Sequence, residues 1–263
     1  MQRPHYIRDI LLDRKAILSF DEYPFSVPSV RSLDRLDLHP KVTFFIGENG
    51  SGKSTLIEAI AVNAGLNPEG GSRDFNFGTR ISHSNLSSYL RLNKGVPHPK
   101  DWYYLRAESF FNVATEIENL DIDPESDIEI IHNRLFVPKK IGPAYGNKAL
   151  HEQSHGEAFL ALLLKRFRGN GLYILDEPEA ALSPLRQMSI LSVIHRLIQL
   201  NSQFIIATHS PIIMSYPDSM IYHCSDDGIV QVNYRDTEHF NVTRDFLNNP
   251  DKMLDTLLSD DTN

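Results

Sequence analysis

One nine-residue segment, GENGSGKST at residues 47–55, constrains the fold of this chain more than any other feature. It matches the pattern G-x-x-x-x-G-K-[ST] at Gly47, Gly52, Lys53 and Ser54. A β-rich apolar run, Val42–Ile46, precedes it, and a helical pattern, Ser54–Ala64, follows it. The segment is therefore predicted to be a loop that joins a strand to a helix in an α/β sheet.

The residue types of this loop suit the binding of a nucleotide's phosphates. Glycines let successive backbone N–H groups curl around an anion, and the N-terminus of the following helix adds positive potential. Lys53 supplies a charge to the β- and γ-phosphates, and the Ser54 hydroxyl is a hard oxygen ligand for Mg²⁺. The residues expected to contact the nucleotide are Gly47, Asn49, Gly50, Ser51, Gly52, Lys53, Ser54 and Thr55.

A pair of acidic residues follows a second apolar run. Leu172–Leu175 predicts a buried strand, and Asp176 and Glu177 come at its carboxyl end, where open parallel sheets bind their ligands. Asp176 is then placed to hold Mg²⁺, directly or through water. Glu177 is placed to orient or deprotonate an attacking water. A solvated acidic strand end is the alternative interpretation.

A histidine follows a third apolar run. Gln203–Ala207 predicts another buried strand, and His209 lies just beyond it in the segment Thr208–Pro211. A histidine at this edge could contact the γ-phosphate and sense its loss, whereas a lone histidine at a strand end also serves as a simple polar cap.

The remaining patterns give the fold class. Strands are predicted at Ala16–Phe20, Val42–Ile46, Leu172–Leu175, Phe204–Ala207, Met220–His223 and Ile229–Tyr234. Helices are predicted at Ser54–Ala64, Gly156–Phe167, Pro184–Leu200 and Thr243–Leu258. This alternation favours one α/β domain over residues 1–263, with a mostly parallel sheet and helices on both faces. Within it we expect a small inserted helical lobe at about 80–165 and a C-terminal helical tail at 240–263.

Composition bounds the compartment and the partners. Cys224 is the single cysteine, so no internal disulfide can form, which fits a reducing, cytoplasmic setting. The longest apolar stretch, which contains Phe159–Leu164, is far too short to span a membrane. The net charge of −8 argues against tight non-specific DNA binding, but a local basic patch would still allow nucleic acid as a partner. The candidates for that patch are Arg73, Arg80, Arg91, Lys94 and Lys100.

Together these motifs resemble those of the ATP-binding-cassette (ABC) class of P-loop ATPases. GENGSGKST resembles its Walker A motif, LYILDE at 172–177 its Walker B motif with the catalytic glutamate, and ATHS at 207–210 its switch-histidine loop. The segment QSHGE at 153–157 is similar to the S-G-G-[QE] core of the signature motif, with His155 in place of the first glycine. The resemblance implies ATP hydrolysis with Mg²⁺, with Glu177 and His209 in catalysis.

The resemblance also implies a dimer. In the class, the signature of one subunit caps the γ-phosphate held by the loop of the other. Ser154, Gly156 and Glu157 would carry this role here, in a head-to-tail homodimer that acts on a protein partner. The family's D-loop aspartate is replaced by Ser183, and no clear Q-loop glutamine is present. Glu108 is the best counterpart of that glutamine and a candidate for a position near Mg²⁺, with a plain surface loop as the alternative.

Details of the motifs favour one branch of the class. DEPEAALSP at 176–184 and THSP at 208–211 are similar to the soluble branch that includes RecF- and SMC-like ATPases, but no long heptad pattern is present. The chain most resembles a compact group marked by RAESFFN, HEQSHGE and DEPEAALSP. Three other roles stay open: the ATPase subunit of a membrane transporter, a DNA-maintenance or defence ATPase that acts with a nuclease or other effector, and a nucleotide-dependent switch.

The sequence also contains candidates for an adenine-stacking residue and two patterns that are typical of metal-binding sites. Tyr23 and Phe25 are candidates to stack on adenine, with core packing as the alternative. His151, Glu152 and His155 fit the zinc pattern H-E-x-x-H, but Gly156 suits a helix start better than a helix interior. Asp121, Asp123 and Asp127 suggest a calcium loop, which Pro124 and a missing glycine break.

Overall fold

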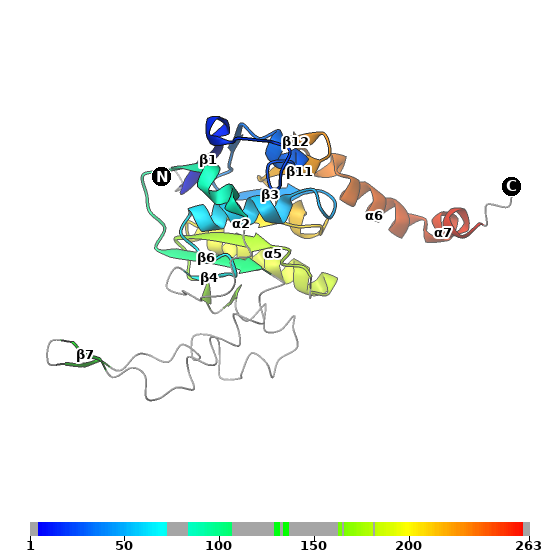
Figure 1. Ribbon diagram of the computed structural model, residues 1–263. Helices are drawn as coiled ribbons and strands as arrows, with labels where there is room; N and C mark the ends of the chain where they lie inside the picture. The colour runs from blue at the N-terminus through cyan, green and yellow to red at the C-terminus, as the bar shows by residue number, and fades with distance from the viewer. Residues whose placement is uncertain are drawn as a thin grey trace.

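The computed structural model of the chain describes residues 5–72, 84–106, 129–131, 134–136, 163–164, 166–180 and 182–259. A large sheet forms the centre of the described part (Figure 1). Its middle strands are β11 (Met220–Ser225), β3 (Val42–Ile46), β10 (Gln203–Ala207), β9 (Gly171–Asp176) and β6 (Asp101–Arg106), which pair in parallel in this order. Two antiparallel strands, β12 (Gly228–Val232) and β4 (Gly71–Ser72), close its edges.

The central strands are buried on both faces. Every residue of β3, β9 and β10 is buried, as expected of a parallel sheet that is covered on both sides. Phe44 packs into one hydrophobic cluster and its neighbour Phe45 into the other, because successive side chains of a strand point to opposite faces. This arrangement confirms the predicted α/β class.

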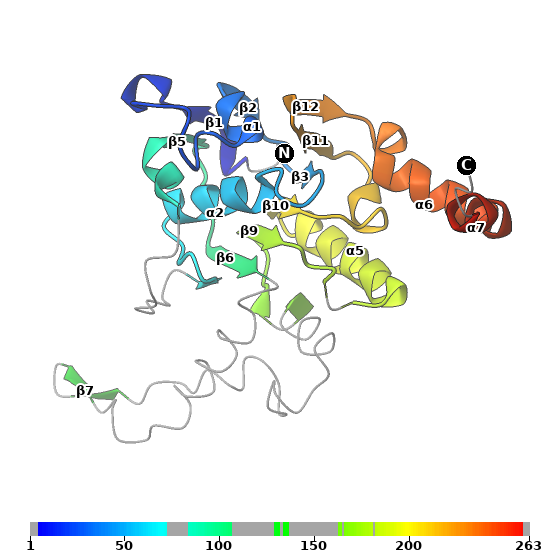
Figure 2. The ribbon, with the colours of Figure 1, turned by 45° about the vertical axis from the view of Figure 1, so that its right-hand side comes forward.

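Helices α2 (Lys53–Asn63) and α5 (Pro184–Gln199) cover opposite faces of this sheet (Figure 2). Beyond α2 lies a smaller antiparallel sheet of β2 (Arg35–Asp37), β1 (Ile7–Leu12) and β5 (Leu90–Lys94). The shorter elements are α1 (Pro28–Arg31), β7 (Glu129–Ile131), β8 (Arg134–Phe136), and the 3-10 turns Arg14–Ala16, Asn85–Tyr89, Ile213–Ser215 and Tyr234–Asp236.

The predicted strand Ala16–Phe20 is wrong. This segment begins at the last residue of a 3-10 turn and is mostly exposed, with the Leu18 side chain fully in solvent. The strand lies earlier, at β1, and the charged Asp9 in its middle hid it from a search for apolar runs. Asp9 is nevertheless buried, because its carboxylate accepts hydrogen bonds from Asn93 (2.8 Å) and Arg35 (3.2 Å).

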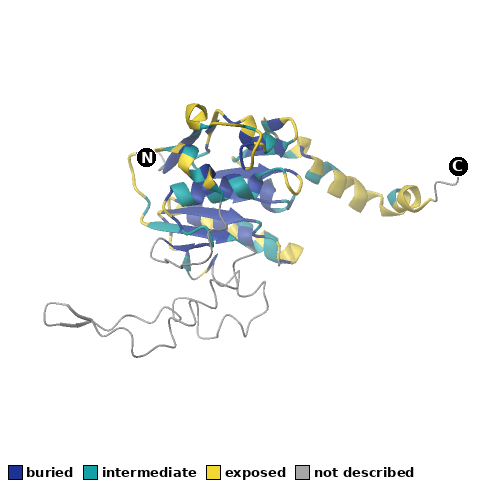
Figure 3. Cartoon of the chain, in the orientation of Figure 1, coloured by how far each residue is buried: buried dark blue, intermediate teal, exposed yellow. Residues whose placement is uncertain are grey.

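The C-terminal segment is two helices rather than the single helix predicted at Thr243–Leu258. α6 (Glu238–Asn248) and α7 (Pro250–Leu258) are separated by Asn249, whose φ of −142° is not helical. Pro250 explains the break, since proline lacks an N–H and disfavours helical geometry in the residue before it. Neither helix buries a residue, and both lead away from the sheet (Figures 1 and 3).

Two further boundaries differ from the sequence-based expectations. β12 ends at Val232, so the expected strand Ile229–Tyr234 is shorter, and Tyr234 begins a 3-10 turn. Within the expected lobe at about 80–165, residues 90–94 and 101–106 are strands of the two sheets, and most of the remainder lies outside the described residues. The division into domain, lobe and tail stays a prediction. None of the helices in the described ranges is long and apolar enough to cross a membrane.

Candidate nucleotide-binding site

The carboxyl ends of four neighbouring parallel strands meet at one edge of the main sheet. Phe45 on β3 is level with Ala207 on β10, which is level with Asp176 on β9, which is level with Arg106 on β6. The residues that follow these strands therefore face one region. The glycine-rich loop, His209 and Glu177 are brought together there because the strands end in register.

The loop after β3 has the backbone geometry that its glycines permit. Gly47, Gly50 and Gly52 all have positive φ angles, of 140°, 82° and 93°. At Gly47 a Cβ atom would lie 2.1 Å from the carbonyl oxygen of Cys224 on β11, so no larger residue fits. Gly52 is the N-cap of α2, so the backbone amides of the loop lead directly into the N-terminus of that helix.

Lys53 is a buried cation within this loop. Its side chain is folded back, and Nζ donates hydrogen bonds to the carbonyl oxygens of Gly47 (2.9 Å) and Glu48 (2.8 Å). Burial lowers the pKa of Lys53, and the carboxylate of Glu177 is the strongest of the nearby groups that oppose this shift. The loop therefore concentrates positive charge beside the acidic strand end.

Ser54 and Asp176 lie in direct contact. The Ser54 hydroxyl donates a hydrogen bond of 3.1 Å to Oδ1 of Asp176, which is 5% exposed. The guanidinium of Arg106 lies 3.8 Å from Oδ2 of Asp176 and pairs with Glu58 at 3.0 Å. A hydroxyl and a carboxylate at this separation supply the hard oxygen ligands that Mg²⁺ prefers, so the donor set fits that ion.

Glu177 has an unusual backbone conformation. Its φ is +51°, in the left-handed region that is uncommon for residues other than glycine, and its N–H donates to the carbonyl of Ala207 at 3.0 Å. The turn leaves its side chain partly exposed at the site, with one carboxylate oxygen 3.5 Å from Nε2 of His209. Such strain at a strand end is typical of a functional position.

His209 is fixed by a second carboxylate. Its backbone N–H donates to Oε1 of Glu179 at 2.5 Å, and burial raises the pKa of Glu179. Burial lowers the pKa of His209, and the charge of Lys53 lowers it further. Both effects favour the neutral form of His209, which has one donor and one acceptor nitrogen on its ring.

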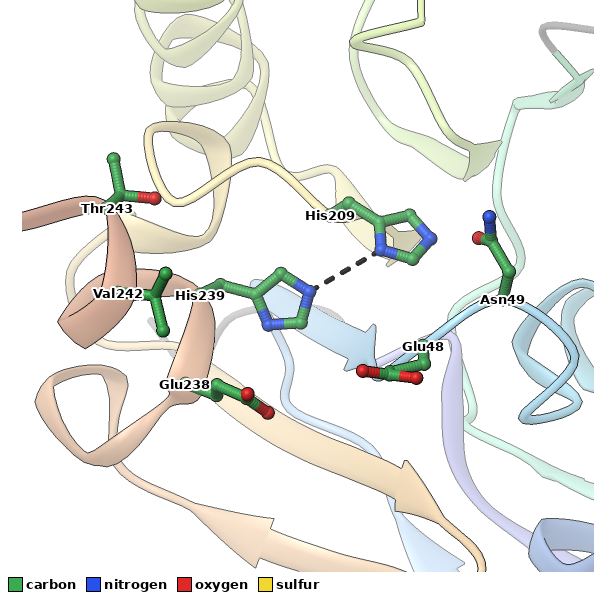
Figure 4. Close-up of a pocket in the computed structure, with 7 residues that line it drawn as sticks. All are labelled: Glu48, Asn49, His209, Glu238, His239, Val242 and Thr243. Carbon is green, nitrogen blue, oxygen red and sulfur yellow. Dashed lines mark hydrogen bonds between the residues drawn. The ribbon is translucent and has the colours of Figure 1, made fainter. Parts of the chain in front are cut away.

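An open pocket of about 470 Å³ lies on the outer side of His209 (Figure 4). Glu48 and Asn49 of the loop form one wall. The first turns of α6 form the other, and His239 points from there toward His209. The lining residues are Glu48, Asn49, His209, Glu238, His239, Val242 and Thr243.

The predicted residues of the loop and the strand ends lie close together, whereas other predicted residues lie elsewhere in the structure or outside the described residues. Tyr23 is 64% exposed, and its hydroxyl lies 3.3 Å from Oγ1 of Thr55 at the start of α2. Phe25 is instead buried in the core beside Tyr89, so it is not available for stacking. The signature residues Ser154, Gly156 and Glu157, the Q-loop candidate Glu108, and the zinc and calcium patterns at 151–155 and 121–127 all lie outside the described residues.

Sequence reasoning missed four residues around the site: Glu58, Arg106, Glu179 and His239. Arg106 could have been found, since it is a charged residue at the end of an apolar strand. Glu179 lies inside the DEPE segment, but its contact with His209 depends on the fold. No local pattern connects His239 to a loop that is 30 positions earlier in the chain. No cluster of three or more histidine, cysteine, aspartate or glutamate residues suitable for a metal ion occurs in the described part of the chain.

Comparisons with known proteins found two matching family models and several similar proteins. A family model described as an AAA domain matches residues 23–149. A second, described as an AAA domain and a candidate AbiEii toxin of a type IV toxin–antitoxin system, matches residues 153–215. A candidate ABC transporter ATP-binding protein of Methanothermobacter marburgensis is 27% identical over an alignment of 218 positions. That alignment covers 79% of this chain and 74% of that protein. The DNA replication and repair protein RecF of Colwellia psychrerythraea is 72% identical over 25 residues, or 10% of this chain and 7% of RecF.

Among solved structures, an ATP-binding cassette of an ABC transporter in its ADP conformation is 18% identical and covers 99% of this chain and 100% of its own, with a TM-score of 0.48. The SMC head domain from Thermotoga maritima is 15% identical and covers 87% of this chain and 99% of its own, with a TM-score of 0.45.

The parallel sheet and the glycine-rich loop between β3 and α2 define the class of fold, an α/β fold with the P-loop arrangement, and both matching family models describe AAA domains. The chain also shares sequence with the M. marburgensis ABC transporter ATP-binding protein and, over a short segment, with RecF.

Proposed function

We propose that this chain binds ATP with Mg²⁺ at the strand-end site, hydrolyses it, and uses the cycle to change the conformation of a partner. The contact between Ser54 and Asp176, at 3.1 Å, is the observation that carries the proposal. It joins the phosphate-binding loop to the acidic strand end, which lie 122 positions apart in the chain. The two halves of a nucleotide site are therefore adjacent.

Binding is assigned to the loop and the start of α2. The amides of residues 50–54 and the Lys53 ammonium would hold the β- and γ-phosphates, with Gly47, Asn49 and Thr55 completing the contact surface. Ser54 and Asp176 would hold Mg²⁺, which offsets the charge of the phosphates when it is bound. Glu108 stays a candidate for a position near that ion. The exposed ring of Tyr23, beside Thr55, is proposed as the face on which adenine stacks.

Hydrolysis is assigned to Glu177 and His209. Glu177 would accept a proton from the attacking water, because its carboxylate is partly exposed and follows directly after Asp176. Nε2 of His209, 3.5 Å from that carboxylate, would donate to the γ-phosphate and so register its presence. Both side chains sit on backbone that is held by the ends of β9 and β10.

A second copy of the chain is proposed to complete the site. The pocket between Glu48, Asn49 and the start of α6 is open to solvent in the described part of the chain, so a second copy could cover it. In a head-to-tail homodimer, Ser154, Gly156 and Glu157 of the second copy would contact the γ-phosphate there. Two equivalent sites would then close and open together.

The partner is proposed to be a protein, and nucleic acid is a second candidate. The RecF match and the AbiEii description favour a DNA-maintenance or defence role, whereas the M. marburgensis relative favours a transporter subunit. DNA-stimulated ATP hydrolysis with a steep salt dependence would support the first, and co-purification with a permease the second. Of the candidate basic patch, Arg91, Lys94 and Lys100 are exposed.

Lys53→Ala tests the binding assignment. Hydrogen bonds to charged groups contribute about 1.5–3 kcal/mol, so the affinity for Mg·ATP is expected to fall by roughly 10- to 150-fold. Titration of a fluorescent ATP analogue measures it, with the exposed Lys15→Ala as the matched control. Wild-type affinity in Lys53→Ala would remove the proposal. ATP binding with no measurable turnover would instead point to a nucleotide-dependent switch.

A further inference from the structure

The histidine on α6 is one of the residues near the site that the roles assigned above leave unused. Nε2 of His239 lies 3.4 Å from Nδ1 of His209, and the two ring centroids are 5.6 Å apart (Figure 4). On its other side, Nε2 of His209 lies 3.5 Å from a carboxylate oxygen of Glu177. The three side chains thus form a row that runs from the strand-end acid to α6.

We propose that His239 positions His209, by donating a hydrogen bond from its Nε2 to Nδ1 of His209 and so holding Nε2 of His209, as an N–H donor, toward Glu177 and the γ-phosphate site. This inference rests on the proposed function and names what sets the orientation and tautomer of its histidine. His239 has no role in contacting the nucleotide itself.

The direction of the hydrogen bonds follows from the contacts. A neutral imidazole has one donor and one acceptor nitrogen. Nε2 of His209 makes no hydrogen bond within the described residues, but it lies 3.5 Å from the Glu177 carboxylate, whose negative charge favours an N–H at that position. Nδ1 of His209 is then the acceptor, and Nε2 of His239 is the donor. Nδ1 of His239 is left as an acceptor with no hydrogen-bond partner within the described residues.

The surroundings of both histidines favour the neutral form that this hydrogen bond requires. Burial lowers the pKa of His239, and the neighbouring His209, His223 and Lys53 lower it further, while Glu238 opposes them. Burial and Lys53 likewise lower the pKa of His209, opposed by Glu177 and Glu48. A protonated ring in the middle of the row would have no acceptor nitrogen, and the hydrogen bond between the rings would be lost.

The start of α6 is anchored to the loop that carries His209. The Thr237 side chain caps the helix by accepting from the Phe240 N–H at 3.3 Å, and its hydroxyl donates to the Tyr234 carbonyl at 2.8 Å. The Tyr234 hydroxyl in turn donates to the carbonyl of Pro211, two residues after His209, at 2.9 Å. These hydrogen bonds hold the first turn of α6, which carries His239, beside the loop that carries His209.

Two substitutions of His239 separate positioning from packing. His239→Gln keeps an N–H donor near the position of Nε2, whereas His239→Met fills similar space without a donor. A net hydrogen bond contributes about 0.5–1.5 kcal/mol, which corresponds to a fall in kcat of roughly 2- to 13-fold for His239→Met with KM for ATP unchanged. His239→Gln should restore most of the rate. In a His209→Ala background, His239→Met should have no further effect, since the two residues act as one unit. A loss of equal size in the Gln and Met variants, or additive losses in the double variant, would overturn the proposal.

A second readout does not depend on ATP turnover. Long-range ¹H–¹⁵N NMR of histidine-labelled protein reports which ring nitrogen carries the proton. The Nε2–H form of His209 is expected in the wild type and in His239→Gln, and a mixture of tautomers in His239→Met. His195→Met, which removes a histidine from α5, serves as the control and should leave the His209 signals unchanged. A His209 tautomer that is the same in all variants would contradict the positioning role even if the chain hydrolyses ATP. The expected tautomers in a chain without turnover would uphold it and count against the proposed hydrolysis alone.

Discussion

Replacing Glu177 by glutamine is the sharpest perturbation of the proposed chemistry. The amide has nearly the same shape as the carboxylate but is not a base at neutral pH. The backbone turn at Glu177, with φ of +51° and an N–H bond of 3.0 Å to Ala207, does not involve the side chain and should persist. The side chain is 37% exposed, so removing its charge should change stability little.

The expected loss of rate follows from the role of a general base. Such a group contributes about 10²- to 10⁴-fold, which is roughly 3–5 kcal/mol of activation free energy. Steady-state ATPase assays of Glu177→Gln should therefore show a fall in kcat of at least ~10²-fold with ATP binding retained. Light scattering should show a dimer that accumulates with ATP, because the bound nucleotide is not hydrolysed.

Asp227→Asn is the matched control for this experiment. Asp227 is an exposed acid in the turn between β11 and β12, so the same loss of one carboxylate should leave the rate unchanged. If Glu177→Gln hydrolyses ATP as fast as the wild type and the control, the assignment of the base is refuted.

Three other predictions concern the aromatic platform, the buried acid and the loop. Tyr23→Ala should weaken ATP binding by roughly 5- to 150-fold, since stacking of a base on an aromatic ring contributes about 1–3 kcal/mol. Tyr23→Phe keeps the ring and should bind ATP normally in the same fluorescence titration. Burial raises the pKa of Glu179 in the folded protein above its ordinary value of 4.5. Protonated Glu179 therefore stabilises the folded state below pH 4.5, and this stabilisation is lost as the pH rises through the raised pKa. Glu179→Gln should thus have a higher Tm than wild type at neutral pH, with the gap closing toward pH 4.5; a gap that does not change with pH would contradict this. Gly47→Ala should lower the free energy of unfolding by more than Gly50→Ala: each costs about 1–3 kcal/mol of backbone strain, but only at Gly47 does the added Cβ meet a carbonyl, 2.1 Å away. Equal losses in urea unfolding would refute the clash.

The sequence was most informative where one local pattern reports one local structure. Val42–Ile46 is a mostly apolar run because β3 is buried on both faces, and the glycine pattern begins directly after it, at Gly47. Asp176 and Glu177 were placed at the same edge by the same reasoning. Their proximity to the loop follows from parallel strands that end in register.

The sequence was least informative where structure depends on distant residues. β1 contains Asp9, whose burial is permitted only by Arg35 and Asn93, and these side chains belong to β2 and β5. No window of sequence shows that pairing. His239 is similar: its proximity to His209 results from the path of the chain through β11, β12 and the turn before α6. The break between α6 and α7 is different, because Pro250 is itself a local signal for the end of a helix.

A structure of the protein with a non-hydrolysable ATP analogue and Mg²⁺ tests the central claim most directly. The account predicts phosphates against the backbone amides of residues 50–54, a cation bound by Ser54 and Asp176, and the carboxylate of Glu177 directed at the γ-phosphate. A nucleotide bound elsewhere, or a cation held by neither Ser54 nor Asp176, would contradict it.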